Sequence, residues 1–194
     1  MSCSLESARD FFALHKDGGD LAKKIQDLPC SVQIAWEQIA VCADSPGPVV
    51  NTELLLRQIV CPVHFDFETN EVKPNLFEDA ISKGASIHRL SHTTEEKIVD
   101  IAQQRVYSQN INPPKTGPRT LIGYVSIAAH AARAVRADVE GFRERQVLAI
   151  YDTANDKDQS HADICLLRRQ TQAEISVKSQ LYLLAKDSLK RTSG

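Results

Sequence analysis

The side chains of this 194-residue chain that could do chemistry fall into two groups, and the first is rich in histidine. It comprises His64, Asp66, His88 and His92. Imidazole and carboxylate groups bind divalent metals and transfer protons. Their spacing matches no ligand motif such as His-Glu-x-x-His, so folding would have to bring two segments together. The sequence favours the simpler interpretation that these are ordinary loop or surface residues.

The second group is an acidic segment that contains Asp152, Asp156, Asp158, His161 and Asp163. Carboxylates and a histidine directly after a strand could hold a metal or supply a general base. The segment is not an EF-hand loop: read from Asp156, the glycine position is His161 and the closing glutamate position is Leu167. A solvated acidic turn is the default prediction, although no other part of the chain is as dense in chemically capable groups.

Motifs for a nucleophile, a phosphate loop or a cofactor are absent from the sequence. No serine lies in Gly-x-Ser-x-Gly, and neither common glycine-rich phosphate loop occurs. Ser126 and His130 are one helical turn apart only if a helix begins early, and neither has an obvious orienting carboxylate. The five cysteines are odd in number and widely spread, which indicates free thiols. We therefore predict no cofactor and no metal site.

Basic residues form two further groups, although the formal net charge of the chain is −2. The C-terminal group contains Arg168, Arg169, Lys186, Lys190 and Arg191, and the other contains Arg133, Arg136, Arg143 and Arg145. Such residues could contact phosphates. No aromatic residues alternate with them, as stacking on single strands would require. The sequence allows nucleic-acid binding but does not favour it.

The chain divides at Ser45-Pro46-Gly47-Pro48, because two prolines around a glycine cannot continue a helix. Residues 1–45 before it predict a helical N-terminal flank, in which apolar residues recur at helical spacing. Residues 50–167 predict the core domain. Residues 170–194 predict a C-terminal amphipathic helix, at about 173–190, that offers Ile175, Leu181, Leu184 and Leu189 to the core or to a partner.

Short apolar segments and helical patterns interleave within the core domain. We expect strands at residues 54–60, 85–90, 121–127, 146–151 and 161–167. We expect helices at residues 93–105, capped by Thr93, and at residues 128–139, which are rich in alanine. The order lacks the regular strand–helix alternation of a doubly wound sheet. It predicts an α+β fold with a small, largely antiparallel sheet, packed helices and helical flanks.

Residues 54–166 resemble a family of small uncharacterised bacterial proteins. The likeness is carried by Leu56 to Asp66 (R-x-I-x-P-x-x-F-D in the family), Glu68 to Phe77, Gly84 to Arg89, and Tyr151 to Ile164 (D-x-P…A-H-A-x-I in the family). The family has no assigned activity, so the resemblance implies a domain rather than a reaction. It singles out five polar residues, namely His64, Asp66, Arg89, Asp152 and His161.

Three functions follow as hypotheses. The first is a non-catalytic bacterial accessory protein that docks on partner proteins through its amphipathic flanks. The alternative is a small hydrolase- or transferase-like enzyme that uses His64, Asp66, Arg89, Asp152 and His161. A nucleic-acid-binding accessory subunit is the third. The N-terminus lacks the features of a secretory signal and no apolar run approaches about 18 residues, so we expect a cytoplasmic protein with no membrane contact. A homo-oligomer is compatible with the sequence.

Overall fold

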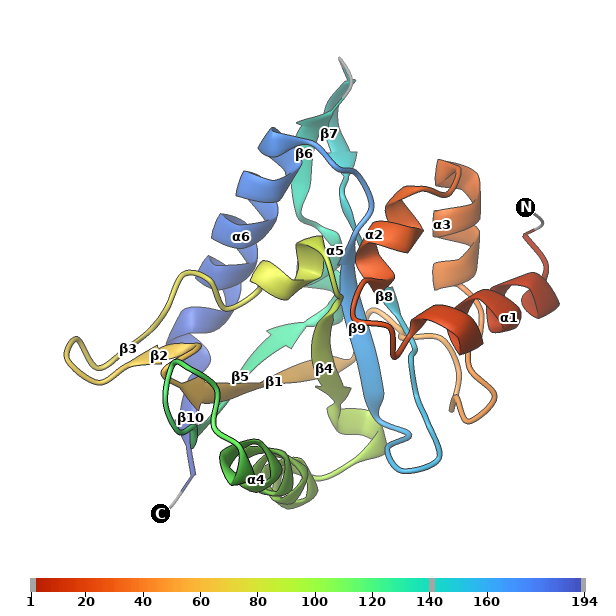
Figure 1. The fold of residues 1–194 in the computed structure, drawn as a ribbon. Coiled ribbons are helices and arrows are strands. Elements are labelled where there is room, and N and C mark those ends of the chain that lie inside the picture. Colours follow the sequence, from red (N-terminus) through yellow and green to blue (C-terminus); the bar gives the residue numbers. More distant parts are fainter. Residues whose placement is uncertain (1–2, 140–141, 193–194) are drawn as a thin grey trace.

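The computed structural model describes residues 3–139 and 142–192, with the side chains of residues 142–144 left aside. Its described residues form six α-helices and a six-stranded sheet whose strand pairs are all antiparallel, so the predicted α+β class is confirmed (Figure 1). The strand order is β10-β5-β1-β4-β9-β8. No helix of this described part is long and apolar enough to cross a bilayer.

The elements are connected by segments of different length, the longest being residues 38–53 between the third helix and the first strand. The helices are α1 (Leu5–His15), α2 (Leu21–Gln26), α3 (Cys30–Glu37), α4 (Glu95–Ile111), α5 (Ala129–Arg133) and α6 (Thr171–Ala185). The strands of the sheet are β1 (Leu54–Cys61), β4 (Ala85–Arg89), β5 (Thr120–Ala128), β8 (Leu148–Tyr151), β9 (His161–Leu166) and β10 (Lys190–Arg191). Two separate hairpins are β2 (Phe65–Asp66) with β3 (Glu71–Val72), and β6 (Arg136–Val139) with β7 (Phe142–Gln146). Short 3₁₀ turns are η1 (Glu78–Ile81), η2 (Leu90–His92) and η3 (Lys186–Ser188).

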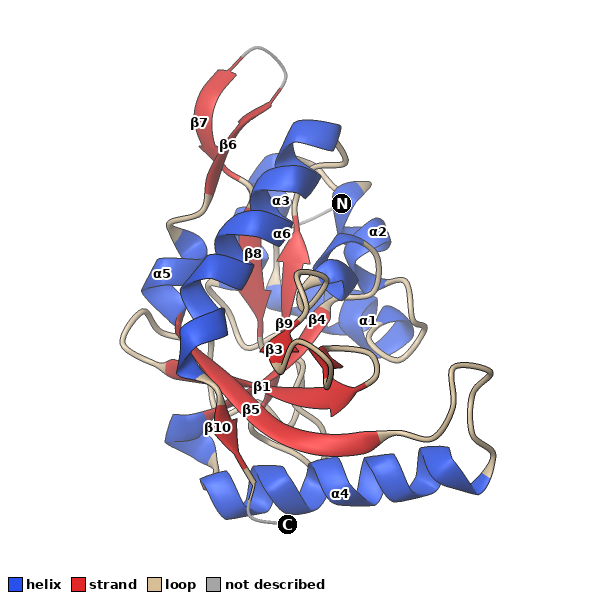
Figure 2. Cartoon of the chain, turned by 90° about the vertical axis from the view of Figure 1, so that its left-hand side faces the viewer, coloured by secondary structure: helices blue, strands red, loops and turns tan. Residues whose placement is uncertain are grey.

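One face of the sheet carries the main hydrophobic core. Alternate strand residues such as Leu55, Ile87 and Ile164 point into it, because side chains of a strand alternate between the two faces. Helices α5 and α6 cover this face (Figure 2). The inward side of α6 presents Ala173, Val177, Leu181 and Ala185 at four-residue spacing, and all four are fully buried. The C-terminal helix is therefore part of the core.

The opposite face is covered by two separate groups of helices. Helices α1 to α3 pack over β8 and β9, where Phe12 lies against both Trp36 and Tyr151. Helix α4 lies across β1 and β5, where Ile98 packs with Leu56 and Tyr124 (Figure 2). Between these two covers, β4 and β9 carry polar side chains on the same face. This polar strip is where the candidate site lies.

Several expected elements differ from the structure at their ends. The helix predicted for residues 128–139 is wrong beyond Arg133, because residues 136–139 alternate between exposed and buried and pair with β7 as a strand. Helix α4 begins after Thr94, whose hydroxyl accepts the amide of Lys97, and it continues to Ile111 rather than ending near residue 105. The last helix ends at Ala185, and residues 190–191 instead add β10 to the sheet edge.

Candidate functional site

A serine and a histidine from adjacent strands meet on the polar strip. Ser86 of β4 lies directly opposite Asp163 of β9, and His88 lies opposite His161. Diagonal neighbours on one face of an antiparallel pair are within reach of longer side chains. Accordingly, Ser86 Oγ lies 2.6 Å from His161 Nε2. Both side chains are half-buried, so a small molecule can approach them.

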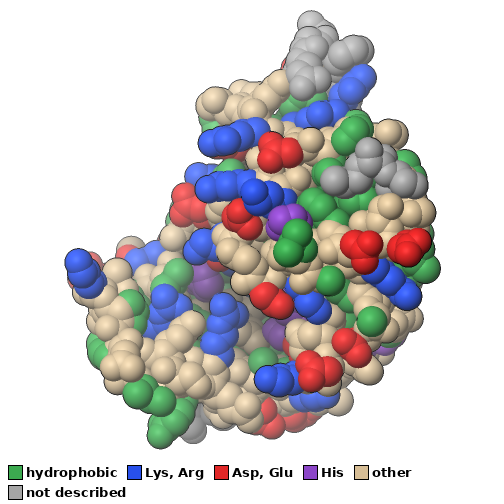
Figure 3. All heavy atoms as spheres, turned by 45° about the vertical axis from the view of Figure 1, so that its right-hand side comes forward, with side chains coloured by type: hydrophobic (Ala, Val, Ile, Leu, Met, Phe, Trp, Pro, Cys, Tyr) green, Lys and Arg blue, Asp and Glu red, His purple; other side chains and the backbone are tan. Residues whose placement is uncertain are grey.

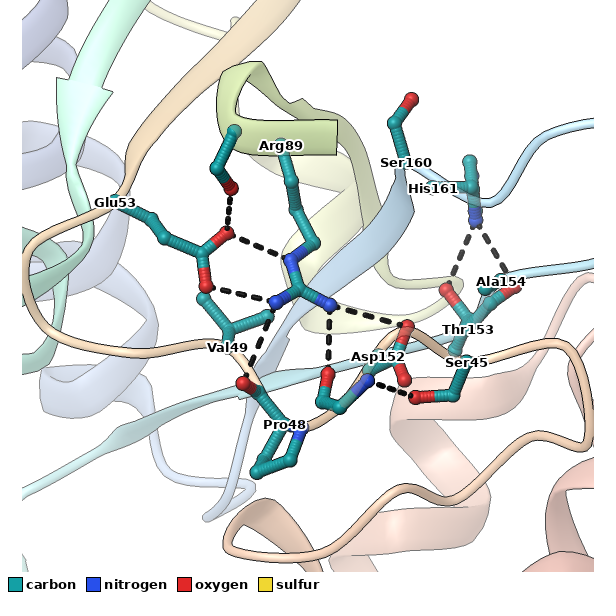
Figure 4. A network of polar contacts seen from close by, with 12 residues as sticks. Ser45, Pro48, Val49, Glu53, Arg89, Asp152, Thr153, Ala154, Ser160 and His161 are labelled. Atoms are coloured by element: carbon teal, nitrogen blue, oxygen red, sulfur yellow. Dashed lines mark hydrogen bonds and ion pairs between the residues drawn. The ribbon is translucent and has the colours of Figure 1, made fainter. Parts of the chain in front are cut away.

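The other side of the imidazole determines which atom carries its proton. His161 Nδ1 lies 2.9 Å from Thr153 Oγ1 and 3.3 Å from the Thr153 carbonyl oxygen (Figure 4). A carbonyl oxygen can only accept, so Nδ1 must be the protonated atom. In the neutral ring, Nε2 then carries the lone pair and accepts the hydrogen bond from Ser86 Oγ.

A buried carboxylate completes this arrangement. Thr153 Oγ1 donates to Asp163 Oδ2 at 2.7 Å, and that oxygen lies 3.9 Å from His161 Nδ1. The hydroxyl of Thr153 thus links the imidazole to the carboxylate. A nucleophile, a base hydrogen-bonded to it and a group that orients the base are the parts from which nucleophilic catalysis is built.

A second polar network holds the neighbouring loop in place. His88 Nδ1 lies 3.0 Å from Asp158 Oδ2, and Ser160 Oγ donates to Asp158 Oδ1 at 2.6 Å. Although burial alone would raise it, the hydrogen bonds from His88 and Ser160 hold the pKa of Asp158 well below its usual range. On its far side, His88 Nε2 lies 3.0 Å from the amide nitrogen of Gln58. This network anchors the loop before His161 to β4 and β1.

Ser86 opens onto a cleft of about 420 Å³ between β1, β4 and α4. Its charged lining is mostly cationic and comprises Arg57, Lys83, Arg105 and Arg119 against one carboxylate, Asp79. One wall of the cleft is apolar and consists of Val60, Val63, Ala102 and Val106. Gln58 and His64 also line the cleft. The volume is in the range of small-molecule sites, although the lining is more polar and more charged than usual.

The residues of the first predicted group lie in different places. His64 lines the cleft, and its burial, together with the positive charge of Arg57, lowers its pKa to about 3. His64 is therefore a neutral wall residue at physiological pH. Asp66 lies in β2, outside the lining of the cleft, where its Oδ1 accepts the amide of Glu68 at 2.9 Å. His92 lies at the end of η2 beside a different depression.

Arg89 lies on the core face of β4 and connects three segments of the chain. Its guanidinium donates to both oxygens of Glu53 at 2.7 Å and to the carbonyl oxygen of Gly47 at 2.7 Å (Figure 4). Asp152 lies on its other side, with Oδ1 3.5 Å from Arg89 Nη1. Burial raises the pKa of Asp152 to about 6, although Arg89 opposes the shift. Arg89 thus attaches the turn at Gly47 to β4, and neither Arg89 nor Asp152 lines the cleft at Ser86.

The alternatives of a metal site and a nucleic-acid surface gain little from the structure. Among the described side chains, those of residues 3–139 and 145–192, no three or more His, Cys, Asp or Glu are placed to hold a metal ion. Several of the predicted basic residues are engaged in contacts within the chain: Lys186 with Asp187, Lys190 with Glu95, Arg191 with Asn70, and Arg133 with Glu37.

The other members of the basic groups are spread out. Arg168 and Arg169 follow β9, and Arg136 and Arg145 lie in the hairpin of β6 and β7. The side chain of Arg143 is outside the described atoms. On the face drawn in Figure 3, basic and acidic side chains are interspersed rather than gathered into one field.

Sequence reasoning singled out His161 but missed Ser86 and Thr153. Ser86 is 75 positions from His161, so no local spacing connects them. The alternative pair, Ser126 and His130, is divided between β5 and α5, because the helix begins only at Ala129, and His130 Nδ1 contacts the Asn51 carbonyl. A local signal does exist, because Ser86 and His88, like His161 and Asp163, are polar pairs two residues apart with a buried apolar residue between them.

Comparison of the chain with protein-family models, with curated proteins and with solved structures gives no match. The resemblance of residues 54–166 to small bacterial proteins therefore stays a prediction.

Proposed function

We propose that this protein is a small serine-dependent hydrolase in which Ser86 is the nucleophile and His161 the general base. The observation that carries the proposal is the 2.6 Å contact between Ser86 Oγ and His161 Nε2, with His161 Nδ1 oriented by Thr153. This is a specific form of the hydrolase alternative that the sequence suggested. Of the residues named there, it keeps His161 as the base.

The proposed reaction is the hydrolysis of an ester. Ser86 Oγ bonds to the carbonyl carbon while its proton moves to His161 Nε2. The carbon–oxygen bond to the leaving group breaks, and that oxygen takes the proton from His161. A water molecule then attacks the acyl-serine, passes a proton to His161, and releases the acid as Ser86 recovers its proton. Asp163, reached through Thr153, stabilises the imidazolium that forms in each half of the cycle.

The positive lining of the cleft supports the same reaction. Negative charge develops on the carbonyl oxygen when the serine attacks, and fixed positive groups stabilise it most strongly where water is partly excluded. Lys83, Arg105 and Arg119 surround the space next to Ser86. The cleft therefore places the nucleophile in a positive electrostatic environment, and the base bonds to that nucleophile from β9.

The interaction-module hypothesis relied on two amphipathic flanks with unoccupied apolar faces. Those faces are largely used within the chain, since Phe12 and Trp36 of the N-terminal flank and Leu181 of α6 are fully buried. Exposed apolar residues of α6, such as Ile175 and Leu184, are all that this hypothesis retains from the predicted C-terminal stripe. For this reason we favour the enzyme.

A fluorophosphonate probe tests the proposal without knowledge of the substrate. Attack by Ser86 forms an Oγ–phosphorus bond, expels fluoride and passes the serine proton to His161. We expect one labelled peptide by mass spectrometry, the one that contains Ser86, and no labelling in Ser86→Ala. His161→Gln should slow labelling by about 10²–10⁴-fold, the usual contribution of a general base.

Ser108→Ala is the matched control, because Ser108 is an exposed serine of α4, the helix that lines the cleft. It should label at the wild-type rate. Circular dichroism and thermal unfolding establish that each variant is folded. Equal labelling of wild type and folded Ser86→Ala would overturn the proposal.

A further inference from the structure

We infer that the cleft beside Ser86 binds a phosphate group, and that the substrate is a small organic ester that carries one. That the ligand is a substrate depends on the proposed function, whereas the anion site is inferred from the cleft alone. Four cationic side chains line the cleft against one carboxylate, an excess of three positive charges over that carboxylate. His64 adds none near neutral pH, because its pKa is about 3.

The single carboxylate is already shared by two of the cations. Asp79 lies 3.3 Å from Arg57 Nη2 and 3.9 Å from Lys83 Nζ. Arg57 is almost fully buried and also donates to the carbonyl oxygens of Leu76 and Ser86, which holds its guanidinium rigidly under β4. Asp79 therefore offsets part of the positive charge of Arg57 and Lys83. The cleft lining has no second carboxylate to offset that of Arg105 or Arg119.

Arg119 is held at the cleft by contacts that do not neutralise it. Its backbone is fixed to the end of α4 by Asn110, which accepts from the Arg119 amide at 2.7 Å and donates to its carbonyl oxygen at 2.8 Å. Its Nη1 donates to the neutral side-chain oxygen of Gln109 at 2.9 Å. Arg105 lies on α4 one turn before Gln109, and its side chain is exposed at the rim of the cleft. Arginine forks match phosphate oxygens well.

The electrostatics of His64 agree with this placement. After burial, the positive charges of Arg57, Arg119 and Arg105 are among the causes that lower its pKa. Several cations thus act on one point of the cleft wall. A dianionic phosphate would relieve their mutual repulsion, whereas a monoanion would offset less of it.

The apolar part of the lining restricts the rest of the ligand. Val60, Val63, Ala102 and Val106 offer a wall for a small hydrocarbon or ring next to the phosphate. At about 420 Å³ the cleft holds a small molecule rather than a polymer. Because Ser86 lies in the same lining, a phosphate on Arg105 and Arg119 would place the remainder of the molecule beside the nucleophile.

The test uses phenyl phosphate as the probe and phenol as its uncharged match. Calorimetric titration of the Ser86→Ala protein should show binding of phenyl phosphate, at least about tenfold weaker binding of phenol, and loss of phosphate affinity as salt is raised. Arg105→Gln should weaken phenyl phosphate binding about tenfold, as expected for one charge-assisted hydrogen bond. Arg105 is exposed, so this change should leave folding intact.

Lys97→Gln is the control, because it removes one exposed positive charge from the same helix outside the cleft lining. It should bind phenyl phosphate as the parent protein does. Equal binding of phenyl phosphate and phenol, or equal losses in Arg105→Gln and Lys97→Gln, would overturn the inference. Phosphate binding without fluorophosphonate labelling would instead reject the serine nucleophile and leave the anion site standing. Labelling of Ser86 without phosphate binding would reject the anion site alone.

Discussion

Ser86 lies directly opposite Asp163 in the ladder of β4 and β9, yet its hydroxyl bonds to His161, two residues earlier on the same face. This diagonal contact leaves the space between His161 and Asp163 to Thr153, which bonds to both. The order Ser86, His161, Thr153, Asp163 is thus a result of strand register. It places the carboxylate one hydrogen bond further from the base than a direct contact would.

The position of Thr153 predicts a specific effect of removing its hydroxyl. Thr153→Val keeps the shape of the side chain but deletes the link between His161 and Asp163. The link includes a hydrogen bond to the Asp163 carboxylate, and a hydrogen bond to a charged group contributes about 1.5–3 kcal/mol, so we expect fluorophosphonate labelling of Ser86 to slow by at least about tenfold. Thr153→Ser retains the hydroxyl and should restore most of the rate. A valine variant that labels at the wild-type rate across the pH range would contradict the proposed orienting role.

Asp152 predicts a pH dependence of stability. Its pKa in the folded protein is about 6 against an ordinary value of 3.8, so the folded state binds the proton more tightly. The stability it contributes is present below about pH 4 and is lost as pH rises through about 6, by roughly 3 kcal/mol. Asp152→Asn lacks this titration. Its free energy of unfolding, minus that of wild type, should rise by that amount between about pH 4 and about pH 7 in urea titrations. A difference that does not change with pH would refute the assignment.

The pair formed by Glu53 and Arg89 predicts a large loss of stability when one partner is removed. Both side chains are almost fully buried and joined by two bonds of 2.7 Å. Glu53→Ala leaves a buried guanidinium without its main partner, which costs about 3–5 kcal/mol. Glu53→Gln should cost less, since an amide still accepts one bond.

The ion pair of Glu78 and Lys178 is the control for this prediction. It lies at the surface with an N–O distance of 3.2 Å. Glu78→Ala should cost no more than about 1 kcal/mol in the same urea measurement. Equal losses in Glu53→Ala and Glu78→Ala would show that the buried pair contributes nothing beyond a surface one.

The close approach of Gly123 to β10 predicts that a side chain at this position would displace that strand. A Cβ at this position would lie 2.0 Å from the carbonyl oxygen of Lys190, and the φ of Gly123 is +154°. Gly123→Ala should therefore displace β10, and trypsin should cleave after Lys190 or Arg191 faster than in wild type. Gly117→Ala is the control, since it shares a positive φ but has open space around its Cβ position. Unchanged cleavage in Gly123→Ala would mean that β10 tolerates the shift.

The sequence by itself predicted much of the secondary structure and the fold class. Strands at 54–60, 85–90, 121–127 and 161–167 match β1, β4, β5 and β9 closely, because period-two alternation and short apolar runs rich in β-branched residues are local properties of the chain. The helix predicted at 128–139 from its alanine content is wrong at residues 136–139, which alternate between exposed and buried and form β6. The sequence also indicates that the segment around His161 is dense in groups that could do chemistry.

Only the tertiary structure decided which of these polar residues meet. Local patterns show that Ser86 and His88 share one face of a strand, and that His161 and Asp163 share one face of another. They do not show that the two strands are neighbours, nor that Ser86 is paired with Asp163. Strand order and register depend on how the whole sheet buries its apolar faces, which is a sum over residues far apart in the chain. The strand order and register place Arg89 where it binds Glu53 and Gly47, and Ser86 where it bonds to His161 as the candidate nucleophile.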